Sequence, residues 1–240
     1  MSITLQPVQG PFIASSATTS ASFTASLTNT PTNGNSIILV YYSVGDVSDP
    51  LITSITQPGV TWTQALSVTG TPQIWIGLVG PGASKLMTIN INTPGNTNVL
   101  EEAQYAEWGG TFAVDQTNSS TGSQSNNPTS TGSVTTTVAN ELLIALVGTF
   151  ASNNGVTQST PQNGFTQFDG FTQVQQGANS NYATVTLLYE VVTVIGSYSS
   201  GTTFAGTLAN WSAAIVSFIQ TAPPLPTVSF IGDGFTFYPV

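Results

Sequence analysis

The chain has 240 residues, of which 40% are hydrophobic and only 5% are charged, and its formal net charge at pH 7 is -9. It contains no Cys and no His, and Lys85 is its one basic residue. These counts exclude disulfides, thiolate metal sites and Ser-His-Asp or Cys-His catalysis. They also argue against nucleic-acid binding, which depends on Lys and Arg contacts to phosphates.

The hydrophobic content is sufficient for a folded core, but no stretch approaches the roughly 20 apolar residues of a membrane-spanning helix. Met1 to Gln6 lack the basic and apolar regions of a secretory signal. A composition typical of extracellular proteins, in a chain without a secretory signal peptide, is expected of a virion protein or of a chain whose signal peptide has been removed. Because so few groups titrate, we expect folding to couple weakly to pH and the protein to tolerate acid.

The first half of the chain reads as a series of short strands. Ala21, Phe23, Ala25 and Leu27 alternate with polar residues, which predicts a half-buried strand. Apolar strands follow at 35–42, 59–62, 73–79 and 99–108, and the turns between segments are predicted at Asn-Gly and Pro-Gly pairs. No window has a helical period, so the helix content should be small.

The second half repeats this pattern. Residues 35–42 resemble 140–147, and 59–62 resemble 164–167, at the same separation of 105 residues. Residues 73–79 correspond to 183–189, and 99–108 correspond to 211–218. We therefore predict an all-β protein of two similar halves, 1–115 and 134–220, joined by a Ser/Thr/Asn-rich surface linker at 116–133.

Strands that cannot bury both faces alone pack best as antiparallel sheets, face to face. The predicted fold is one jelly-roll-like β-sandwich with pseudo-twofold character, and two consecutive small sandwiches are the alternative.

Residues 221–240 form a separate C-terminal unit in the sequence. A Pro-rich spacer is followed by two apolar runs around Gly232-Asp233-Gly234, a hairpin-like pattern. An isolated hairpin is not stable in water, so this arm is expected to pack on its own domain or on a neighbour. The residues expected to make the contacts are Val228, Phe230, Phe235, Phe237 and Tyr238.

The remaining chemical candidates are carboxylates. Glu101 and Glu107 are expected on one face of a strand roughly 20 Å apart, and Glu102 on the other face, which does not suit a glycosidase pair. A pair assembled from distant segments, such as Glu107 with Glu190, stays open as an alternative. Asp46 and Asp49 suit a turn or, less well, a calcium loop. We predict no catalytic residue, no metal and no cofactor.

Two further kinds of site are suggested by the sequence. Trp62 lies beside a Pro-Gly turn and is a candidate for stacking on a sugar, whereas Trp75 and Trp211 are expected in the core. Asn118 and Asn210 begin glycosylation sequons, of which the first should be accessible in the linker and the second crowded by a strand.

The apolar strand at 35–40, the Gly59-Val60-Thr61-Trp62 step and the stretch from Tyr105 to Gly110, with few basic residues, resemble β-sandwich or jelly-roll structural proteins. The resemblance is to those of virions or extracellular filaments from acidothermophilic microbes, and it implies capsid, spike or filament subunits without catalytic residues.

An uncharged β protein also lacks the Lys residues that normally block edge-to-edge pairing, so its sheet edges are suited to assembly. The leading hypothesis is therefore a non-catalytic virion subunit. Its partners would be copies of itself and other coat proteins, without nucleic acid or membrane insertion. The alternatives are an exported filament or pilus subunit and a glycan-binding adhesion module. The predicted location is the virion surface or the extracellular space.

Overall fold

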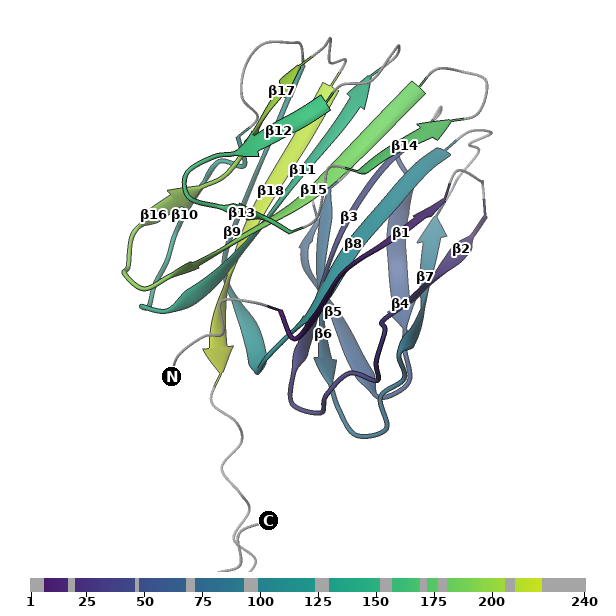
Figure 1. Cartoon of the computed structure of the whole chain (residues 1–240), viewed down its shortest axis with the longest axis vertical. Coiled ribbons are helices and arrows are strands. Elements are labelled where there is room, and N and C mark those ends of the chain that lie inside the picture. Colours follow the sequence, from purple (N-terminus) through teal and green to yellow (C-terminus); the bar gives the residue numbers. More distant parts are fainter. Residues whose placement is uncertain are drawn as a thin grey trace, which may run out of the picture.

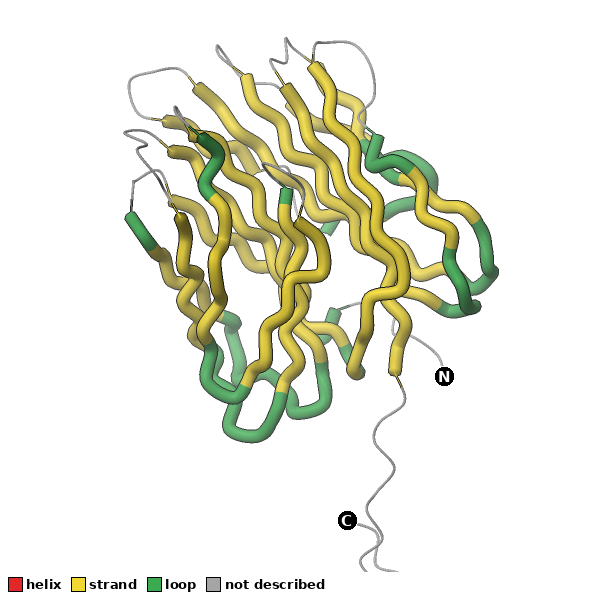
Figure 2. The backbone as a smooth tube through the Cα atoms, turned by 180° about the vertical axis from the view of Figure 1, so that it is seen from behind, coloured by secondary structure: helices red, strands yellow, loops and turns green. Residues whose placement is uncertain are grey.

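The structure is a computed structural model of the chain, and it describes residues 7–16, 20–45, 48–67, 72–92, 99–123, 130–151, 157–168, 172–176, 181–205 and 210–221. These residues form antiparallel β-strands, turns and loops, and no helix occurs among them (Figures 1 and 2). The described part accordingly has no helix that is long and apolar enough to cross a membrane.

The first half of the chain forms two sheets. Its strands are β1 (Gln9–Ser16), β2 (Ser22–Ser26), β3 (Ser36–Gly45), β4 (Leu51–Thr56), β5 (Val60–Ser67), β6 (Gln73–Val79), β7 (Leu86–Asn92) and β8 (Val99–Trp108). Sheet 1 has the order β1-β8-β3-β6-β5, and sheet 2 has the order β2-β7-β4.

The second half forms one large sheet and two ribbons. Its strands are β9 (Thr111–Ser123), β10 (Ser133–Thr135), β11 (Glu141–Ala151), β12 (Thr157–Pro161), β13 (Thr166–Gln167), β14 (Thr172–Gln176), β15 (Asn181–Val192), β16 (Ser197–Ser199), β17 (Thr202–Ala205) and β18 (Asn210–Thr221). Sheet 3 has the order β13-β15-β11-β18-β9, with β14 also on β15, and the ribbons are β10-β16 and β12-β17.

The two halves have the same strand order. In sheets 1 and 3, β1 corresponds to β9, β8 to β18, β3 to β11, β6 to β15, and β5 to the pair β13 and β14. In the outer layers, β2 corresponds to β10, β4 to β12, and β7 to β16 and β17 together. The strand order thus bears out the internal repeat expected from the sequence.

The predicted linker at 116–133 is wrong in its first part. Residues 116–123 belong to β9, the 13-residue strand at the edge of sheet 3, which pairs with β18 along its whole length. Sheet 3 therefore begins at Thr111, inside the predicted first half. The strand resembles a loop in sequence because an edge strand can remain partly solvated on both faces and needs few apolar residues.

The sheets stack in layers, with sheets 1 and 3 in the middle. Alternate residues of β3 point to opposite sides: Ile38, Val40 and Tyr42 face sheet 3, while Ile37, Leu39 and Tyr41 face sheet 2. In β11, Leu142, Ile144 and Leu146 face sheet 1, and the residues between them face the ribbons. Burial of both faces explains why these strands are continuous hydrophobic runs in the sequence. Each half is therefore two-layered, and the halves join through a core that both contribute to. The prediction of one sandwich is thus wrong, because each half forms its own two layers, as in the alternative of two consecutive small sandwiches.

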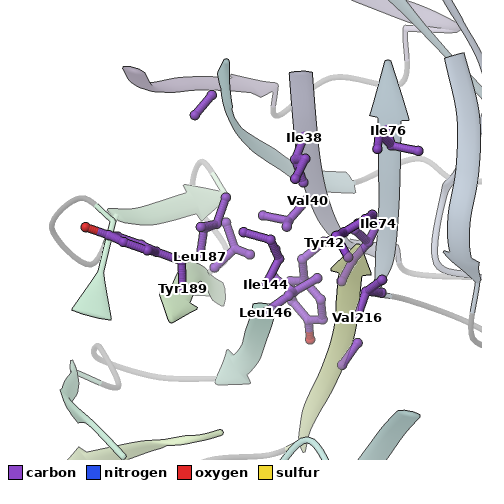
Figure 3. Close-up of a cluster of buried hydrophobic side chains, with 14 of the residues drawn as sticks. Ile38, Val40, Tyr42, Ile74, Ile76, Ile144, Leu146, Leu187, Tyr189 and Val216 are labelled. Atoms are coloured by element: carbon purple, nitrogen blue, oxygen red, sulfur yellow. The ribbon is translucent and has the colours of Figure 1, made fainter. Parts of the chain in front are cut away.

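This shared core lies between sheets 1 and 3 and is shown in Figure 3. It combines β3 and β6 of the first half with β11, β15 and β18 of the second. At one end, the Trp108 ring packs edge-on against Tyr189 at 5.3 Å between centroids and stacks with Phe168 at 5.7 Å. The two sheets contact each other mainly through β8 and β3 of sheet 1, which lie against β14, β15 and β11 of sheet 3.

Gln104 of β8 adds a polar connection between the two sheets. Its amide nitrogen donates to the Val185 carbonyl at 3.0 Å, and its amide oxygen accepts from the Leu187 N–H at 3.0 Å. These backbone groups lie on β15 where its pairing with β14, which ends at Val185, gives way to its pairing with β13. The side chain of the first half thus completes the hydrogen bonding of a strand in the second half.

Gly148 of β11 receives the Tyr42 ring across the shared core. A Cβ at this position would fall within the Tyr42 ring, and the packed sheets leave little freedom to adjust. We predict that Gly148→Ala lowers the free energy of unfolding by about 1–3 kcal/mol through overpacking.

The test is urea unfolding of Gly148→Ala, Tyr42→Leu and the double variant. Because the smaller Leu side chain relieves the contact, the two losses should be strongly non-additive. Simple additivity would show that Gly148 does not act through Tyr42.

Candidate functional site

The most unusual residues in the interior are the carboxylates of β8. This strand is buried along its whole length, and Glu101, Glu102 and Glu107 are each at most 3% exposed. Glu101 and Glu107 point toward sheet 2, as Ala103 and Tyr105 do, while Glu102 points toward sheet 3. The predicted distribution over the two faces is therefore confirmed. The sequence did not indicate that all three would be buried.

Glu107 is fully enclosed by hydrogen-bond donors. One carboxylate oxygen accepts from the Thr32 N–H at 2.8 Å and the Asn35 side-chain amide at 2.6 Å, and the other accepts from the Gln9 amide. These donors come from β1 and from the turn before β3. Glu107 thus ties three segments of the first half together, which is a structural task.

Glu101 and Glu102 have fewer partners. Both Glu101 oxygens lack a hydrogen-bond partner, and Glu102 accepts one bond, from Gln104 at 3.1 Å. Burial raises the pKa of Glu101 to about 7, with the nearby Tyr41 hydroxyl opposing the shift. Burial likewise raises the pKa of Glu102 to about 8, opposed by Gln104. Since an uncompensated charge is costly in an apolar interior, both groups favour the neutral form in the folded protein.

Glu107 and Glu190 do not form a pair suited to glycoside hydrolysis. Glu107 points from sheet 1 toward sheet 2, whereas Glu190 lies on the face of sheet 3 directed at the ribbons. Packed sheets are about 10 Å apart. Both side chains point away from the space between sheets 1 and 3, so this separation exceeds the roughly 5 to 9.5 Å that the reaction needs. The Glu107–Glu190 alternative is thus incompatible with the fold.

No group of three or more acidic residues that could hold a metal ion occurs among the described residues. Of the two loop aspartates, Asp46 lies outside the described residues, so the calcium-loop alternative stays open.

Asp115 and Glu141 both accept hydrogen bonds from the backbone of the turn after β10. Asp115 binds the Thr137 N–H at 3.0 Å, and Glu141 binds the Thr137 and Val138 N–H groups at 3.0 Å each.

The tryptophans have packing roles. Trp75 is buried, as expected, whereas Trp211 is only partly buried and packs against the core behind sheet 3. Trp62, the candidate for sugar stacking, lies over Gly77 of the neighbouring strand and packs against the core of the first half. Its ring N–H donates to Gln57 at 3.2 Å. A ring held in this way has only part of its surface available to a ligand.

The two sequon asparagines differ from the sequence expectation. Asn118 lies in β9 rather than in a linker, and its side-chain amide donates to the Ser133 carbonyl at 2.7 Å. Asn210 is exposed at the first position of β18. The structure therefore makes Asn210 the more accessible of the two, because Asn118 is used in connecting β9 to β10.

The predicted assembly arm, with Val228, Phe230, Phe235, Phe237 and Tyr238, lies outside the described residues, which end at Thr221. What the structure does show is the set of sheet edges. β1 and β5 bound sheet 1, and β9 bounds sheet 3. None of these edge strands contains Lys, Arg or Glu. Apart from Asp115 in β9, these edges therefore lack the charges that commonly prevent strand pairing between molecules.

No protein-family model, no curated protein and no solved structure matches this chain.

The interior carboxyls predict a stability that falls as the pH rises. The folded pKa values of Glu101 and Glu102, about 7 and 8, lie above the ordinary value of 4.5, so the folded state binds more protons than the unfolded state between these limits. Their stabilising contribution is complete below about pH 4.5 and is lost as the pH rises through about 7 and 8. The weak coupling to pH expected from composition thus needs correction above pH 4.5.

We predict a higher Tm at pH 4 than at pH 8.5 and a smaller difference in the Glu101→Gln/Glu102→Gln double variant. Differential scanning calorimetry across this range measures both. Asp169→Asn/Asp233→Asn changes the net charge equally and serves as the control. A double Gln variant with the same pH slope as the control would contradict the assignment.

Proposed function

We propose that this chain is a non-catalytic structural subunit of a virion, forming capsid surface, spike or fibre. The observation that carries the proposal is the repeated strand order: the two halves are two-layered β units with the same strand order, and they pack face to face through sheets 1 and 3. In each half, β1-β8-β3-β6 and β2-β7-β4, or their counterparts, are the nested strand orders of a jelly roll. The fifth strand lies beside the sixth instead of the fourth. Jelly rolls are the usual fold of viral capsid domains, and they also occur in lectins.

The surface chemistry supports an assembly role. A chain with one basic residue forms few ion pairs, so contacts between copies must rely on apolar burial and on hydrogen bonds. The unprotected edges of β1, β5 and β9 offer backbone groups for strand addition. A monomer with such edges would be prone to aggregation, whereas a subunit in an assembly uses them.

The interior supports an acidic setting. Burial favours the neutral forms of the Glu101 and Glu102 carboxyls, and both are protonated at low pH. This fits a particle exposed to an acidic extracellular medium, with copies of the chain and other coat proteins as partners.

An exported filament subunit would use the same edges and the same C-terminal segment, so particle shape distinguishes the two functions. The jelly-roll order favours the virion subunit.

The proposal predicts that the full chain forms regular particles and that a chain lacking residues 223–240 folds without assembling. The described strands end at Thr221, so the deletion removes none of them and none of the described residues of the shared core. Negative-stain electron microscopy measures assembly, and the Tm measures folding. Shells, spikes or fibres support a virion subunit, whereas pilus-like filaments from cells favour the alternative. A full chain that stays monomeric at pH 4 would contradict both.

A further inference from the structure

The two middle sheets meet closely on one side of the molecule and separate on the other. Sheet 1 approaches sheet 3 along β8 and β3, which contact β14, β15 and β11. Following the strand order outward from this contact leads to β6 and β5 in sheet 1 and to β18 and β9 in sheet 3. The edge strands β5 and β9 therefore lie on the same flank of the molecule. Figure 3 shows Ile74 of β6 and Val216 of β18 in the same cluster of buried side chains.

The facing surfaces of the sheets are exposed on this flank. In sheet 1, Thr63 pairs with Ile76 of the shared core, and Thr61 pairs with Leu78, so both threonines point toward sheet 3. Both threonines are nevertheless exposed, and Leu78 is 39% exposed. In sheet 3, Val114 pairs with Phe218 of the shared core and is 40% exposed. Thr117 and Thr121 follow it on the same face, beyond the bulge, and are also exposed. We call this surface the β5–β9 flank, made up of Thr61, Thr63, Leu78, Val114, Thr117 and Thr121.

One wall of the flank is an edge strand that no other strand covers. β9 pairs with β18 over 13 residues, and among the described residues no other strand pairs with its opposite side. Its single charged residue, Asp115, is bound to Thr137. A strand with these properties can accept an extended segment by backbone pairing, with side chains of the added segment placed against Leu78 and Val114.

The chain itself contains a segment of matching chemistry. Residues 222–240 follow β18, and their two runs, Val228–Ile231 and Phe235–Tyr238, each begin with an apolar, a hydroxyl and an apolar residue and contain no basic side chain. β18 ends at Thr221 opposite Thr111, the first residue of β9. A segment continuing from β18 thus leaves the molecule at the end where β9 begins.

The spacer favours a neighbouring copy over the same molecule. It contains Pro223, Pro224 and Pro226, which favour an extended course of about 3.1 Å per residue. To run along its own β9, the segment would have to reverse within these few residues. A direct return beside β9 would also create a parallel pair, whereas every strand pair in the described structure is antiparallel. A second copy has neither restriction.

We infer that the β5–β9 flank is the docking site for residues 228–238 of a second copy of this chain, which add to the free edge of β9. The inference rests on the proposed assembly function and specifies its contact.

The absence of Cys allows a direct test in the full chain. A Thr236→Cys variant labelled with a benzophenone maleimide is assembled together with a ¹⁵N-labelled chain that has no Cys, and the mixture is irradiated. Pepsin digestion and mass spectrometry then locate the cross-links, since Lys85 is the one tryptic site. We expect the photo-adducts on ¹⁵N peptides that contain residues 111–123 or 60–67. The matched control is Thr24→Cys, an exposed position on β2.

A second pair of variants tests the edge itself. Thr117→Lys/Thr121→Lys places charges on the flank and should reduce assembly at least tenfold, while Thr24→Lys should leave it unchanged. Particles with adducts on the cross-linked chain itself, or on other surfaces of the ¹⁵N chain, would overturn the docking site but leave the assembly function standing. A mixture with neither particles nor adducts between chains would overturn both.

Discussion

The shared core between sheets 1 and 3 is the constraint on which the rest of the structure depends. Each of these sheets is covered on both faces. Separating the two halves would therefore expose the apolar inner faces of sheets 1 and 3 to water. The consequence appears in the sequence as apolar runs in β3 and β11, without the alternation of a half-exposed strand. It also fixes details such as Gly148, where any side chain would meet the Tyr42 ring of the other half.

Neutral amides take the place of ion pairs in this molecule. Gln104 bridges sheet 1 to β15, and Gln73 bridges β6 to β4, where its side-chain oxygen accepts from the Ile52 N–H at 2.8 Å. Gln158 of β12 similarly reaches Thr184 of β15 at 2.6 Å. A buried amide satisfies a backbone donor and an acceptor without the desolvation cost of a charge. This solution suits a chain with a single basic residue, in which burial favours the neutral forms of Glu101 and Glu102.

The strands with a strong apolar period were predictable, and so were the turns at Asn33-Gly34, Pro58-Gly59, Pro81-Gly82 and Asn163-Gly164, whereas Pro94-Gly95 lies outside the described residues. The sequence predicted β2, β3, β6 and β8 from their residues, and the Asn163-Gly164 turn has both residues at positive φ, 57° and 87°. The internal repeat followed from two matching segments at one separation.

The edge strand β9, the buried carboxyls and the role of Gln104 could not be predicted from the local sequence pattern. β9 resembles a linker because its environment is an edge, and edges are set by the order of strands rather than by the strand itself. The burial of Glu101 follows from sheet 2 and that of Glu102 from sheet 3, the layers on the two faces of sheet 1, which a single-strand pattern does not reveal. Gln104 gave no signal at all, because its partners, Val185 and Leu187, lie 81 and 83 residues away.

Equilibrium unfolding followed by two probes tests most directly whether the halves depend on one core. Fluorescence of a variant that keeps only Trp108, in the shared core, is compared with far-UV circular dichroism over a urea titration at pH 4. A shared core predicts one transition with coincident midpoints and an m-value appropriate to the whole chain. Two separated transitions, with the fluorescence change confined to one of them, would show that the halves are independent units and would contradict this account.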